Sequence, residues 1–286
     1  MVPNSLTNNI NRKADVINTV KVIDNIPLFS FVELNVNEIC NRVCPFCPRS
    51  EDYPNQNIHM DISIAKIVAD ELSSLNYLAS SRNFQGIVNI SGTGEPLLTK
   101  HICDIVKLFS EKNIHIEIVT NGDKLSTKLI NKLYTAGLSQ LVVSMYDGPE
   151  QVEYFNKLFA KCNIATDLYT LRDRWYSEEE GYGLMYTNRA GSLKLKDKSV
   201  QLVPCYYPSY ATYIDWNGDI LLCCQDMYNR TIKFGNIQNK SLLEIWKNKK
   251  LIEYRQKLKE GNRCLSPCNN CNANGVVFGK NHANKW

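Results

Sequence analysis

Cysteine is the residue of this 286-residue sequence whose number and spacing point most directly to chemistry. Three of the 11 cysteines, Cys40, Cys44 and Cys47, follow the spacing C-x3-C-x2-C. Three thiolates can hold three corners of a [4Fe–4S] cluster and leave the fourth iron open to an exchangeable ligand, whereas a cluster that only transfers electrons normally has four cysteine ligands. A zinc site is the alternative, but it needs a fourth Cys or His nearby, and the nearest histidine, His59, is 12 residues farther on.

The triplet resembles the signature of the radical S-adenosylmethionine (SAM) enzymes, which is C-x3-C-x-aromatic-C after the first strand of a βα barrel. The resemblance implies that the amino and carboxylate groups of SAM chelate the open iron. One-electron reduction would then split SAM into methionine and a 5′-deoxyadenosyl radical, which takes a hydrogen atom from the substrate. Phe46 is the aromatic residue of the signature and would lie against the adenine.

A second motif, Ser-Gly-Thr-Gly-Glu-Pro, begins at Ser91, directly after an apolar stretch. Glycines at the carboxyl end of a barrel strand let the backbone approach a ligand closely, on the side of the barrel where active sites form. An ordinary strand–helix turn would look similar. The motif resembles the family's Gly-Gly-Glu-Pro motif, which holds the amino group of SAM, with threonine in place of the first glycine. The resemblance therefore implies these cofactor-binding residues: Gly92, Thr93, Gly94, Glu95 and Pro96.

Two later strand ends match the family less specifically. Asn121 follows one predicted strand, and Ser144 lies near the end of the next. In the family these places contact the ribose and the carboxylate of SAM, so both residues are cofactor-binding candidates. An ordinary polar turn is an equal alternative at each position.

Six of the other cysteines gather in residues 205–271, where the chain resembles the SPASM/twitch extension of radical SAM enzymes. The matching features are a hairpin sequence, Asp-Trp-Asn-Gly-Asp-Ile-Leu-Leu-Cys-Cys, and a closing C-x2-C. The resemblance implies an auxiliary [4Fe–4S] cluster with all four corners filled, held by Cys205, Cys223, Cys268 and Cys271. Zinc is again the alternative, because four cysteines suit zinc equally well. The expected cofactors are therefore SAM and two [4Fe–4S] clusters.

Three further residues are candidates for direct roles in the reaction. Cys224 and Cys264 lie near the expected auxiliary ligands and could be spare thiols, replacement ligands or hydrogen-atom donors to a substrate radical. A buried, inert cysteine is the plain alternative, and it is the expectation for Cys103 and Cys162. Arg189 follows the last predicted barrel strand, where a guanidinium suits a carboxylate, phosphate or hydroxyl group, although an arginine in a surface turn is equally expected.

These residues need a scaffold, and the sequence predicts an α/β fold. Short apolar stretches alternate with amphipathic helical stretches, which is typical of right-handed βαβ units and a parallel sheet. The expected strands are 28–34, 86–91, 114–120, 140–145, 165–171 and 183–188, and the expected helices are 61–78, 99–112, 124–136 and 150–160. The length fits a partial (β/α)5–6 barrel rather than a full eightfold barrel.

The pattern changes near residue 200. A β-hairpin is expected around an Asn-Gly turn at residues 217–218, followed by one helix over 241–259 that Ser241 caps. We therefore predict an N-terminal extension (1–27), a radical SAM partial barrel (28–200) and a small Cys-rich α/β domain that holds the auxiliary iron–sulfur cluster (201–286).

Composition limits the location and the partners. The formal charge of +4 is small and the basic residues are spread along the chain, so no nucleic-acid or membrane partner is expected. The Asn-rich start lacks the apolar core of a signal peptide, and no apolar run approaches the roughly 18 residues that span a bilayer. We expect a cytoplasmic protein, in which clustered cysteines indicate metal binding or catalysis rather than disulfides.

The expected activity is two-electron oxidation of a hydroxylated small molecule such as a sugar or an aminocyclitol. The spacing of the auxiliary cysteines resembles that of aminocyclitol dehydrogenases with a single auxiliary cluster. A radical SAM epimerase of a sugar, or a peptide-modifying enzyme, is the alternative within the family, and a non-catalytic iron–sulfur or zinc-binding protein is the alternative outside it. The expected partners are a sugar-like substrate or a peptide, and an electron donor such as flavodoxin or ferredoxin.

Overall fold

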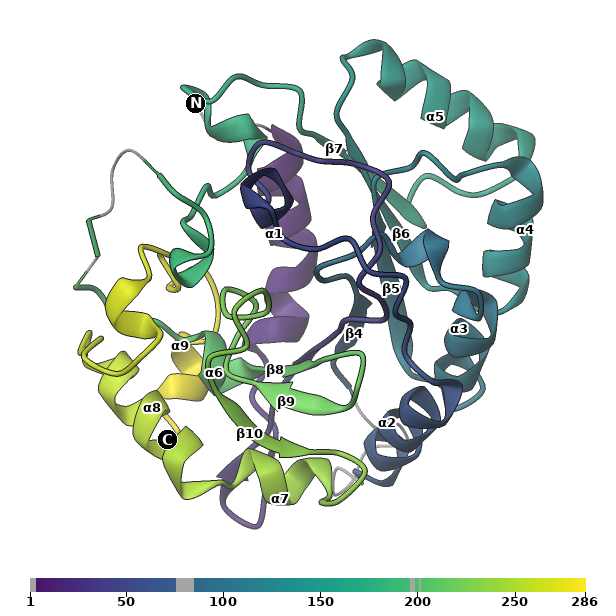
Figure 1. The fold of residues 1–286 in the computed structure, drawn as a ribbon. Helices are drawn as coiled ribbons and strands as arrows, with labels where there is room; N and C mark the ends of the chain where they lie inside the picture. Colours follow the sequence, from purple (N-terminus) through teal and green to yellow (C-terminus); the bar gives the residue numbers. More distant parts are fainter. Residues whose placement is uncertain (1–3, 76–84, 196–198, 201) are drawn as a thin grey trace.

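The computed structural model describes residues 4–75, 85–195, 199–200 and 202–286. In these residues one eight-stranded sheet runs through the molecule in the order β10-β9-β8-β3-β4-β5-β6-β7 (Figure 1). Its strands are β3 (Phe31–Leu34), β4 (Ile87–Ile90), β5 (His115–Thr120), β6 (Gln140–Met145), β7 (Tyr169–Asp173), β8 (Ala211–Ile214), β9 (Asp219–Leu221) and β10 (Lys233–Asn236). The strands from β8 to β7 are parallel, whereas β9 and β10 are antiparallel additions at one edge. The predicted α/β class is confirmed, and the parallel strands match a partial barrel.

Helices follow the parallel strands and cover the outer side of the sheet (Figure 1). They are α2 (Ile62–Ser74), α3 (Ile102–Ser110), α4 (Thr127–Thr135) and α5 (Glu150–Lys161). Asp61 caps α2 by accepting a hydrogen bond from the amide of Ser63 (2.8 Å). The predicted end of that helix, residues 76–78, lies outside the described residues.

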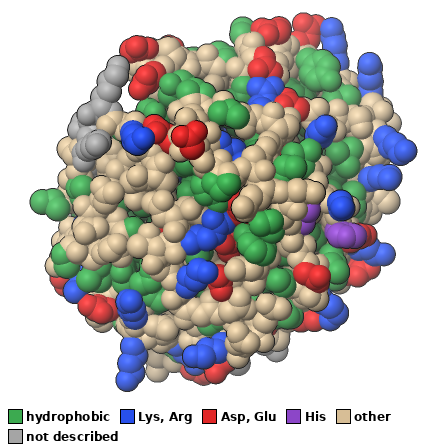
Figure 2. All heavy atoms as spheres, viewed as in Figure 1, with side chains coloured by type: hydrophobic (Ala, Val, Ile, Leu, Met, Phe, Trp, Pro, Cys, Tyr) green, Lys and Arg blue, Asp and Glu red, His purple; other side chains and the backbone are tan. Residues whose placement is uncertain are grey.

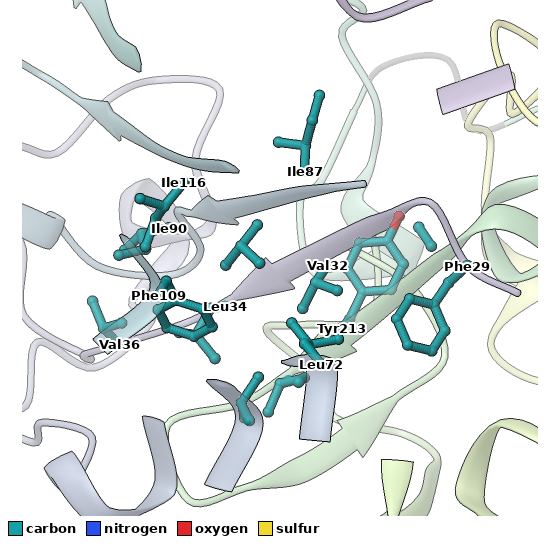
Figure 3. Packing of buried hydrophobic residues seen from close by; sticks show 14 of the residues in the cluster. Phe29, Val32, Leu34, Val36, Leu72, Ile87, Ile90, Phe109, Ile116 and Tyr213 are labelled. Carbon is teal, nitrogen blue, oxygen red and sulfur yellow. The ribbon is translucent and has the colours of Figure 1, made fainter. Parts of the chain in front are cut away.

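The core lies between the sheet and these helices (Figure 3). Val32 and Leu34 on β3 pack with Leu72 of α2 and Phe109 of α3, and all four side chains are fully buried. Every residue of β6 is buried. Strands covered on both faces read as nearly continuous apolar runs, and this is why the sequence predicts them clearly.

The strand predicted at 183–188 is wrong. That segment instead begins with a 3₁₀ turn, η3 (Gly181–Gly183), and leads into a second, η4 (Arg189–Gly191). Gly183, the first residue of the segment, has a φ of +66°, and Tyr182 directly before it has a φ of +51°, and neither value fits an extended strand. On the side of β3 away from β4, the parallel neighbour is β8, which belongs to the predicted hairpin and also pairs with β9.

The single helix predicted over 241–259 is also wrong. It is divided into α7 (Leu242–Trp246) and α8 (Lys249–Lys259). Asn248 leaves the helical conformation between them, and its side chain caps α8 by accepting from the amide of Lys250 (2.9 Å). Ser241 does cap the first piece, in a capping box with Glu244.

The N-terminal extension contains an unpredicted helix, α1 (Asn4–Asn18), which packs against the barrel (Figure 1). Arg12 and Lys13 form ion pairs with Glu117 of β5, at 2.5 Å and 2.7 Å. The Glu117 side chain is fully buried. Burial acts to raise its pKa, but Lys13, His115 and Arg12 outweigh burial and hold the pKa below its usual value. The helix is therefore attached to the inside of the sheet by buried charge.

The Cys-rich C-terminal region shares the sheet of the barrel. Its first strand, β8, lies beside β3, and short elements complete it: α6 (Tyr207–Tyr210), α7, α8, η5 (Cys268–Asn270) and α9 (Lys280–Ala283). A division into domains near residue 200 stays a prediction.

The described helices include none that is long and apolar enough to cross a membrane. The face drawn in Figure 2 carries acidic and basic side chains interspersed.

Candidate functional site

A cavity of about 420 Å³ opens at the carboxyl ends of the parallel strands. The loop after β3 contributes the cysteine triplet, and the turn after β4 contributes residues 92–95. The ends of β5 and β6 contribute Asn121 and Ser144. Active sites of βα barrels form on this side, so the fold brings the predicted residues to the expected place.

The loop that carries the triplet is held in shape by Asn55. The Asn55 side chain accepts from the amide of Cys40 (2.9 Å) and donates to the carbonyl of Cys40 (3.0 Å). The amide of Cys47 donates to the carbonyl of Cys44 (3.0 Å), which closes a tight turn between these two cysteines. All three thiols are free and line the cavity.

The triplet fits three corners of a [4Fe–4S] cluster. Burial raises the pKa of Cys44 to about 12, and the thiols of Cys47 and Cys40 add to this shift. The three sulfurs are therefore grouped, and metal binding would remove their protons. Among the described residues no three His, Cys, Asp or Glu side chains converge on one metal-ion position. A [4Fe–4S] cluster does not require that, because its cysteines bind different irons.

The glycine motif after β4 is pressed against the loop that leads to the triplet. A Cβ atom at Gly94 would lie 1.7 Å from the side-chain oxygen of Asn37, and one at Gly92 would lie 2.3 Å from that of Asn35. Gly92 also has a φ of +134°, which disfavours any side chain. These two positions therefore require glycine, whereas Thr93 fits because its hydroxyl joins a buried network with Asn35 (3.3 Å).

Glu95, in the turn after β4, is hydrogen-bonded to the end of β5, where Asn121 was predicted to bind the cofactor. Its carboxylate is buried and accepts hydrogen bonds from the Thr120 hydroxyl (2.6 Å) and from the amides of Asn121 (2.8 Å) and Leu97 (3.0 Å). Burial raises its pKa, and these donors act in the opposite direction. Pro96 starts η2 (Pro96–Leu98) and does not line the cavity, unlike the other predicted residues of the motif.

Phe46 lies in a cluster of aromatic side chains. Its ring stacks on Tyr146 with 6.0 Å between centroids and 19° between planes, and it also contacts Tyr182 at 5.1 Å. Phe46 and Tyr146 both line the cavity. The arrangement offers a flat apolar surface for a planar ring, as the adenine of SAM requires.

One arginine of β7 contacts Ser144, and a second arginine follows the strand. Arg172 donates to the Ser144 hydroxyl (2.8 Å), and Arg174, one residue beyond the strand, is buried and donates to the carbonyl of Asp173 (2.6 Å). Both arginines line the cavity. Burial lowers the pKa of Arg172 to about 9, and Arg174 adds to this shift. The Arg172 guanidinium beside the Ser144 side chain suits the carboxylate end of SAM.

The second cysteine group is brought together from distant parts of the C-terminal region. Its members, Cys205, Cys223, Cys268 and Cys271, are each only 7–8% exposed. Cys223 interacts electrostatically with each of the other three. Burial raises the pKa of Cys205 to about 11 and that of Cys268 to about 12. Four grouped, buried thiols fit a cluster with all corners filled.

Arg263 and Gly275 fix this group. The Arg263 side chain donates to the carbonyls of Val203 (3.1 Å) and Cys271 (3.3 Å), so it joins the segments that carry the first and last cysteines. A Cβ atom at Gly275 would lie 2.2 Å from the sulfur of Cys205, so this position requires glycine.

Of the three predicted reaction residues, the cavity contains two. Cys224 and Arg189 line it, and they interact electrostatically with each other and with Glu33. Burial raises the pKa of Cys224 to about 12. Burial disfavours the charge of Arg189, but Tyr228 and Cys224 outweigh it and raise the pKa. Arg189 has a φ of +49°, a strained conformation that costs roughly 1–3 kcal/mol and that recurs at functional sites.

Cys264 is not brought to this cavity. Its side chain is exposed and lies in a separate hollow with Leu202 and Asn269. The amide of Cys264 donates to the side-chain oxygen of Asn262 (3.1 Å), which lies three residues after the end of α8. Cys264 is close to Cys268 in the sequence, but this closeness does not bring its side chain to the cavity.

Sequence reasoning missed several cavity residues, including Lys13, Glu33, Tyr146 and Arg172. One signal was available: Glu33 is a charged residue between Val32 and Leu34 in an apolar strand. Since alternate residues of a strand face opposite sides, a charge there indicates a polar cavity. No such signal existed for Lys13, because α1 itself was not predicted.

Comparison with known proteins extends this description. Residues 34–166 match the family model of the radical SAM superfamily, and residues 205–272 match SPASM, an iron–sulfur cluster-binding domain. The chain is 30% identical over 249 residues to the S-adenosyl-L-methionine-dependent 2-deoxy-scyllo-inosamine dehydrogenase of Niallia circulans. The match covers 86% of this chain and 93% of that protein.

Solved structures show the same architecture. The structure of BtrN in complex with AdoMet and 2-DOIA has a TM-score of 0.73 at 28% identity, over 90% of this chain and 98% of BtrN. SuiB of Streptococcus suis bound to the precursor peptide SuiA has a TM-score of 0.52 at 15% identity, over 87% of this chain and 71% of SuiB. At that identity SuiB shares the fold alone.

These similarities confirm the predicted cofactors and enzyme class. The radical SAM match brings SAM and a [4Fe–4S] cluster, and the SPASM match brings an auxiliary iron–sulfur centre rather than zinc. A relative 30% identical is matched over nearly its whole length, and both cysteine groups lie inside the matched regions. The chain therefore belongs to the radical SAM superfamily and carries a C-terminal SPASM domain.

Proposed function

We propose that this enzyme oxidises a hydroxyl-bearing carbon of a small cyclic substrate, an aminocyclitol or a sugar, by two electrons. The observation that carries the proposal is one cavity in which the SAM-motif residues face Glu33, Arg189 and Cys224. Cys224 directly follows Cys223 of the second cysteine group, so a substrate in this cavity lies near both expected clusters. The similarity to a dehydrogenase of 2-deoxy-scyllo-inosamine supports the same substrate class.

We assign the cofactor-binding residues as follows. Cys40, Cys44 and Cys47 hold the cluster that binds SAM, and Cys205, Cys223, Cys268 and Cys271 hold the auxiliary cluster. When bound, the first cluster and SAM supply the radical that accepts a hydrogen atom, and the auxiliary cluster supplies an acceptor for the second electron. Phe46 packs on the adenine, and the residues that surround the rest of SAM are Gly92, Thr93, Gly94, Glu95, Asn121 and Ser144.

We assign two side chains of the cavity to the substrate, Glu33 and Arg189. Oxidation of a hydroxyl to a carbonyl removes a hydrogen atom from carbon, a proton from oxygen and one further electron. Glu33 and Glu95 are the carboxylates among the described residues that line the cavity, and Glu95 is held by three donors. Glu33 accepts from the Ser91 hydroxyl (2.8 Å), and burial raises its pKa. We assign Glu33 as the proton acceptor and Arg189 as the donor that holds the substrate oxygen.

Epimerisation is the second candidate, and a specific observation favours keeping it. An epimerase must return a hydrogen atom to the substrate radical, and Cys224 is a thiol that lines the cavity. Three expectations stay predictions. They are an electron donor such as flavodoxin or ferredoxin, the cytoplasmic location, and a peptide as the alternative substrate.

Turnover in deuterated water distinguishes the two reactions. The reconstituted protein, with SAM and a chemical reductant, is given 2-deoxy-scyllo-inosamine and, in parallel, related sugars. Oxidation predicts a product two hydrogens lighter, with no solvent deuterium placed on carbon, and Cys224→Ala keeps the oxidation. A product of unchanged formula that carries one carbon-bound deuterium, and that is lost in Cys224→Ala, would establish the epimerase instead.

A further inference from the structure

A tyrosine from the C-terminal region contacts the cysteine triplet of the barrel. Tyr228 lies in the segment between β9 and β10, and its hydroxyl is 3.4 Å from the sulfur of Cys47. Both side chains line the cavity, although 181 residues separate them in the chain. None of the sequence motifs includes this contact.

The Tyr228 ring is held by an aromatic contact with the barrel. It packs edge-on against Tyr53, with 4.9 Å between ring centroids and 83° between planes. Tyr53 follows the triplet by six residues, and its hydroxyl donates to the Glu38 carboxylate (2.6 Å). The position of the Tyr228 ring is therefore set by the same loop that carries Cys47.

Arg230 fastens the segment that carries Tyr228. Its guanidinium donates to the Tyr53 hydroxyl (2.7 Å) and to the carboxylates of Asp215 (2.5 Å) and Glu38. Both carboxylates are buried. Arg230 has a φ of +50°, a strained backbone conformation that these buried ion pairs maintain. The contact of Tyr228 with Cys47 is thus fixed from two sides rather than left to a free side chain.

We propose that Tyr228 donates a hydrogen bond to the sulfur of Cys47 and thereby raises the reduction potential of the cluster held by the triplet. A cysteine that binds iron is a thiolate without a proton, so the tyrosine must be the donor. Reduction adds negative charge to the cluster and its sulfurs, and a hydrogen bond to sulfur stabilises that reduced state. The SPASM domain would then control how readily the SAM cluster is reduced.

A redox titration of the complete chain tests this. Wild type and Tyr228→Phe are reconstituted anaerobically, and the titration follows the EPR signal that changes when SAM is added. We expect a more negative reduction potential in Tyr228→Phe at equal iron content, because phenylalanine keeps the ring contact and removes the donor alone. The control is Tyr254→Phe, which removes a hydroxyl on α8 that donates to the carbonyl of Ser266 and is not among the residues that line the cavity with the triplet. It should keep the wild-type potential.

Two outcomes overturn the proposal: an unchanged potential in Tyr228→Phe, or an equal shift in Tyr254→Phe, which would indicate general loosening of the domain. The inference rests on the family's cluster at the triplet and not on any substrate. The reduction potential could stay unchanged while substrate oxidation is observed, or it could shift while no oxidation is observed. The two proposals are therefore tested separately.

Discussion

Neighbouring residues of this chain face different sites. Cys223 belongs to the buried group of four thiols, whereas Cys224 lines the cavity. On β3, Glu33 reaches the cavity between Val32 and Leu34, which are fully buried in the core. Successive side chains of a strand point to opposite sides, so β3 serves the core and the site at once.

Glu33→Gln tests the proposed proton acceptor. Burial raises the pKa of Glu33, while Ser91, Arg189 and Lys13 act in the opposite direction. Only the carboxylate form can take a proton, so the wild-type rate of substrate oxidation should rise with pH through this raised pKa. The glutamine variant should lose that rise and about 10²-fold or more of the turnover. The measurement is the pH profile of product formation.

The matched control for this variant is Glu153→Gln on the exposed side of α5, which should keep the wild-type profile. Cleavage of SAM without substrate should persist in Glu33→Gln, because Glu33 is not among the cofactor-binding residues. A variant that retained the wild-type rise in rate with pH would contradict the assigned role.

Local motifs and a family resemblance predicted a well-defined part of the site. The triplet and the glycine motif are local patterns, whereas the C-terminal cysteines are spread over residues 205–271 and were assigned by their resemblance to the SPASM/twitch extension. The structure brings the triplet and residues 92–95 to the cavity, but not Pro96 or Cys264. Lys13 and Tyr228 could not be found in this way. Their positions depend on tertiary contacts that no spacing in the sequence encodes.

At the scale of elements, α1 is held by charge inside the sheet rather than by an apolar face alone. Lys13 pairs with Glu117 at 2.7 Å, and both side chains are nearly or fully buried. Lys13 also lines the cavity, so the N-terminal helix contributes to the wall of the site. The stability of this wall depends on one carboxylate of β5.

Replacing Glu117 with glutamine should therefore destabilise the protein. The change leaves Lys13 buried without its counter-charge, which costs about 3–5 kcal/mol. The measurement is the midpoint of unfolding in guanidinium chloride, with Glu153→Gln, whose ion pair with Lys157 is exposed, as a control that should change little. An equal midpoint in Glu117→Gln and wild type would show that the pair is not needed.

The sign of the pH dependence follows from the same ion pairs. Burial acts to raise the pKa of Glu117, but Lys13 and its other partners hold it below the usual value in the folded protein. The stabilisation by Glu117 is therefore fully present above the usual carboxyl pKa, and it is lost as the pH falls through the depressed folded pKa.

Periodicity predicted β4, β5 and β6 closely, because these parallel strands are largely buried and most of their residues are apolar. It failed at 183–188, because the backbone at Tyr182 and Gly183, where the strand was expected to begin, has positive φ values that an extended strand does not allow. It also predicted β8 within a hairpin but could not show that β8 pairs with β3. Pattern identifies a strand, but the partner of a strand is decided by the packing of the whole sheet.

At the scale of the molecule, the segments that carry the two cysteine groups are connected by one sheet. β3 leads to the triplet, and β8 and β9 lead to Cys223. Since β8 pairs with β3 in parallel register, from Phe31 opposite Ala211 to Leu34 opposite Ile214, the two groups are held in a fixed relation by strand pairing. Electron transfer between substrate and auxiliary cluster needs such a fixed geometry.

A double variant that combines Cys268→Ala and Cys271→Ala should remove the auxiliary cluster and keep the cluster at the triplet. The double variant loses two corners of the auxiliary site, so the iron content should fall from about eight to about four atoms per chain. Slow cleavage of SAM should persist, because the triplet that we propose as the SAM-binding site lies in another part of the chain. Substrate oxidation should be lost with its proposed electron acceptor. The measurements are iron content, 5′-deoxyadenosine formation and product formation.

A triple variant should show the complementary result. It combines Cys40→Ala, Cys44→Ala and Cys47→Ala, and it should retain about four iron atoms per chain and lose SAM cleavage. Cys162→Ala, which removes a thiol that follows α5 and is in neither group, is the control and should keep both clusters. If the double variant at Cys268 and Cys271 kept full substrate turnover, the auxiliary cluster would only stabilise the fold. The second electron would then have to leave the substrate by another path, and the shared sheet would serve stability rather than electron transfer.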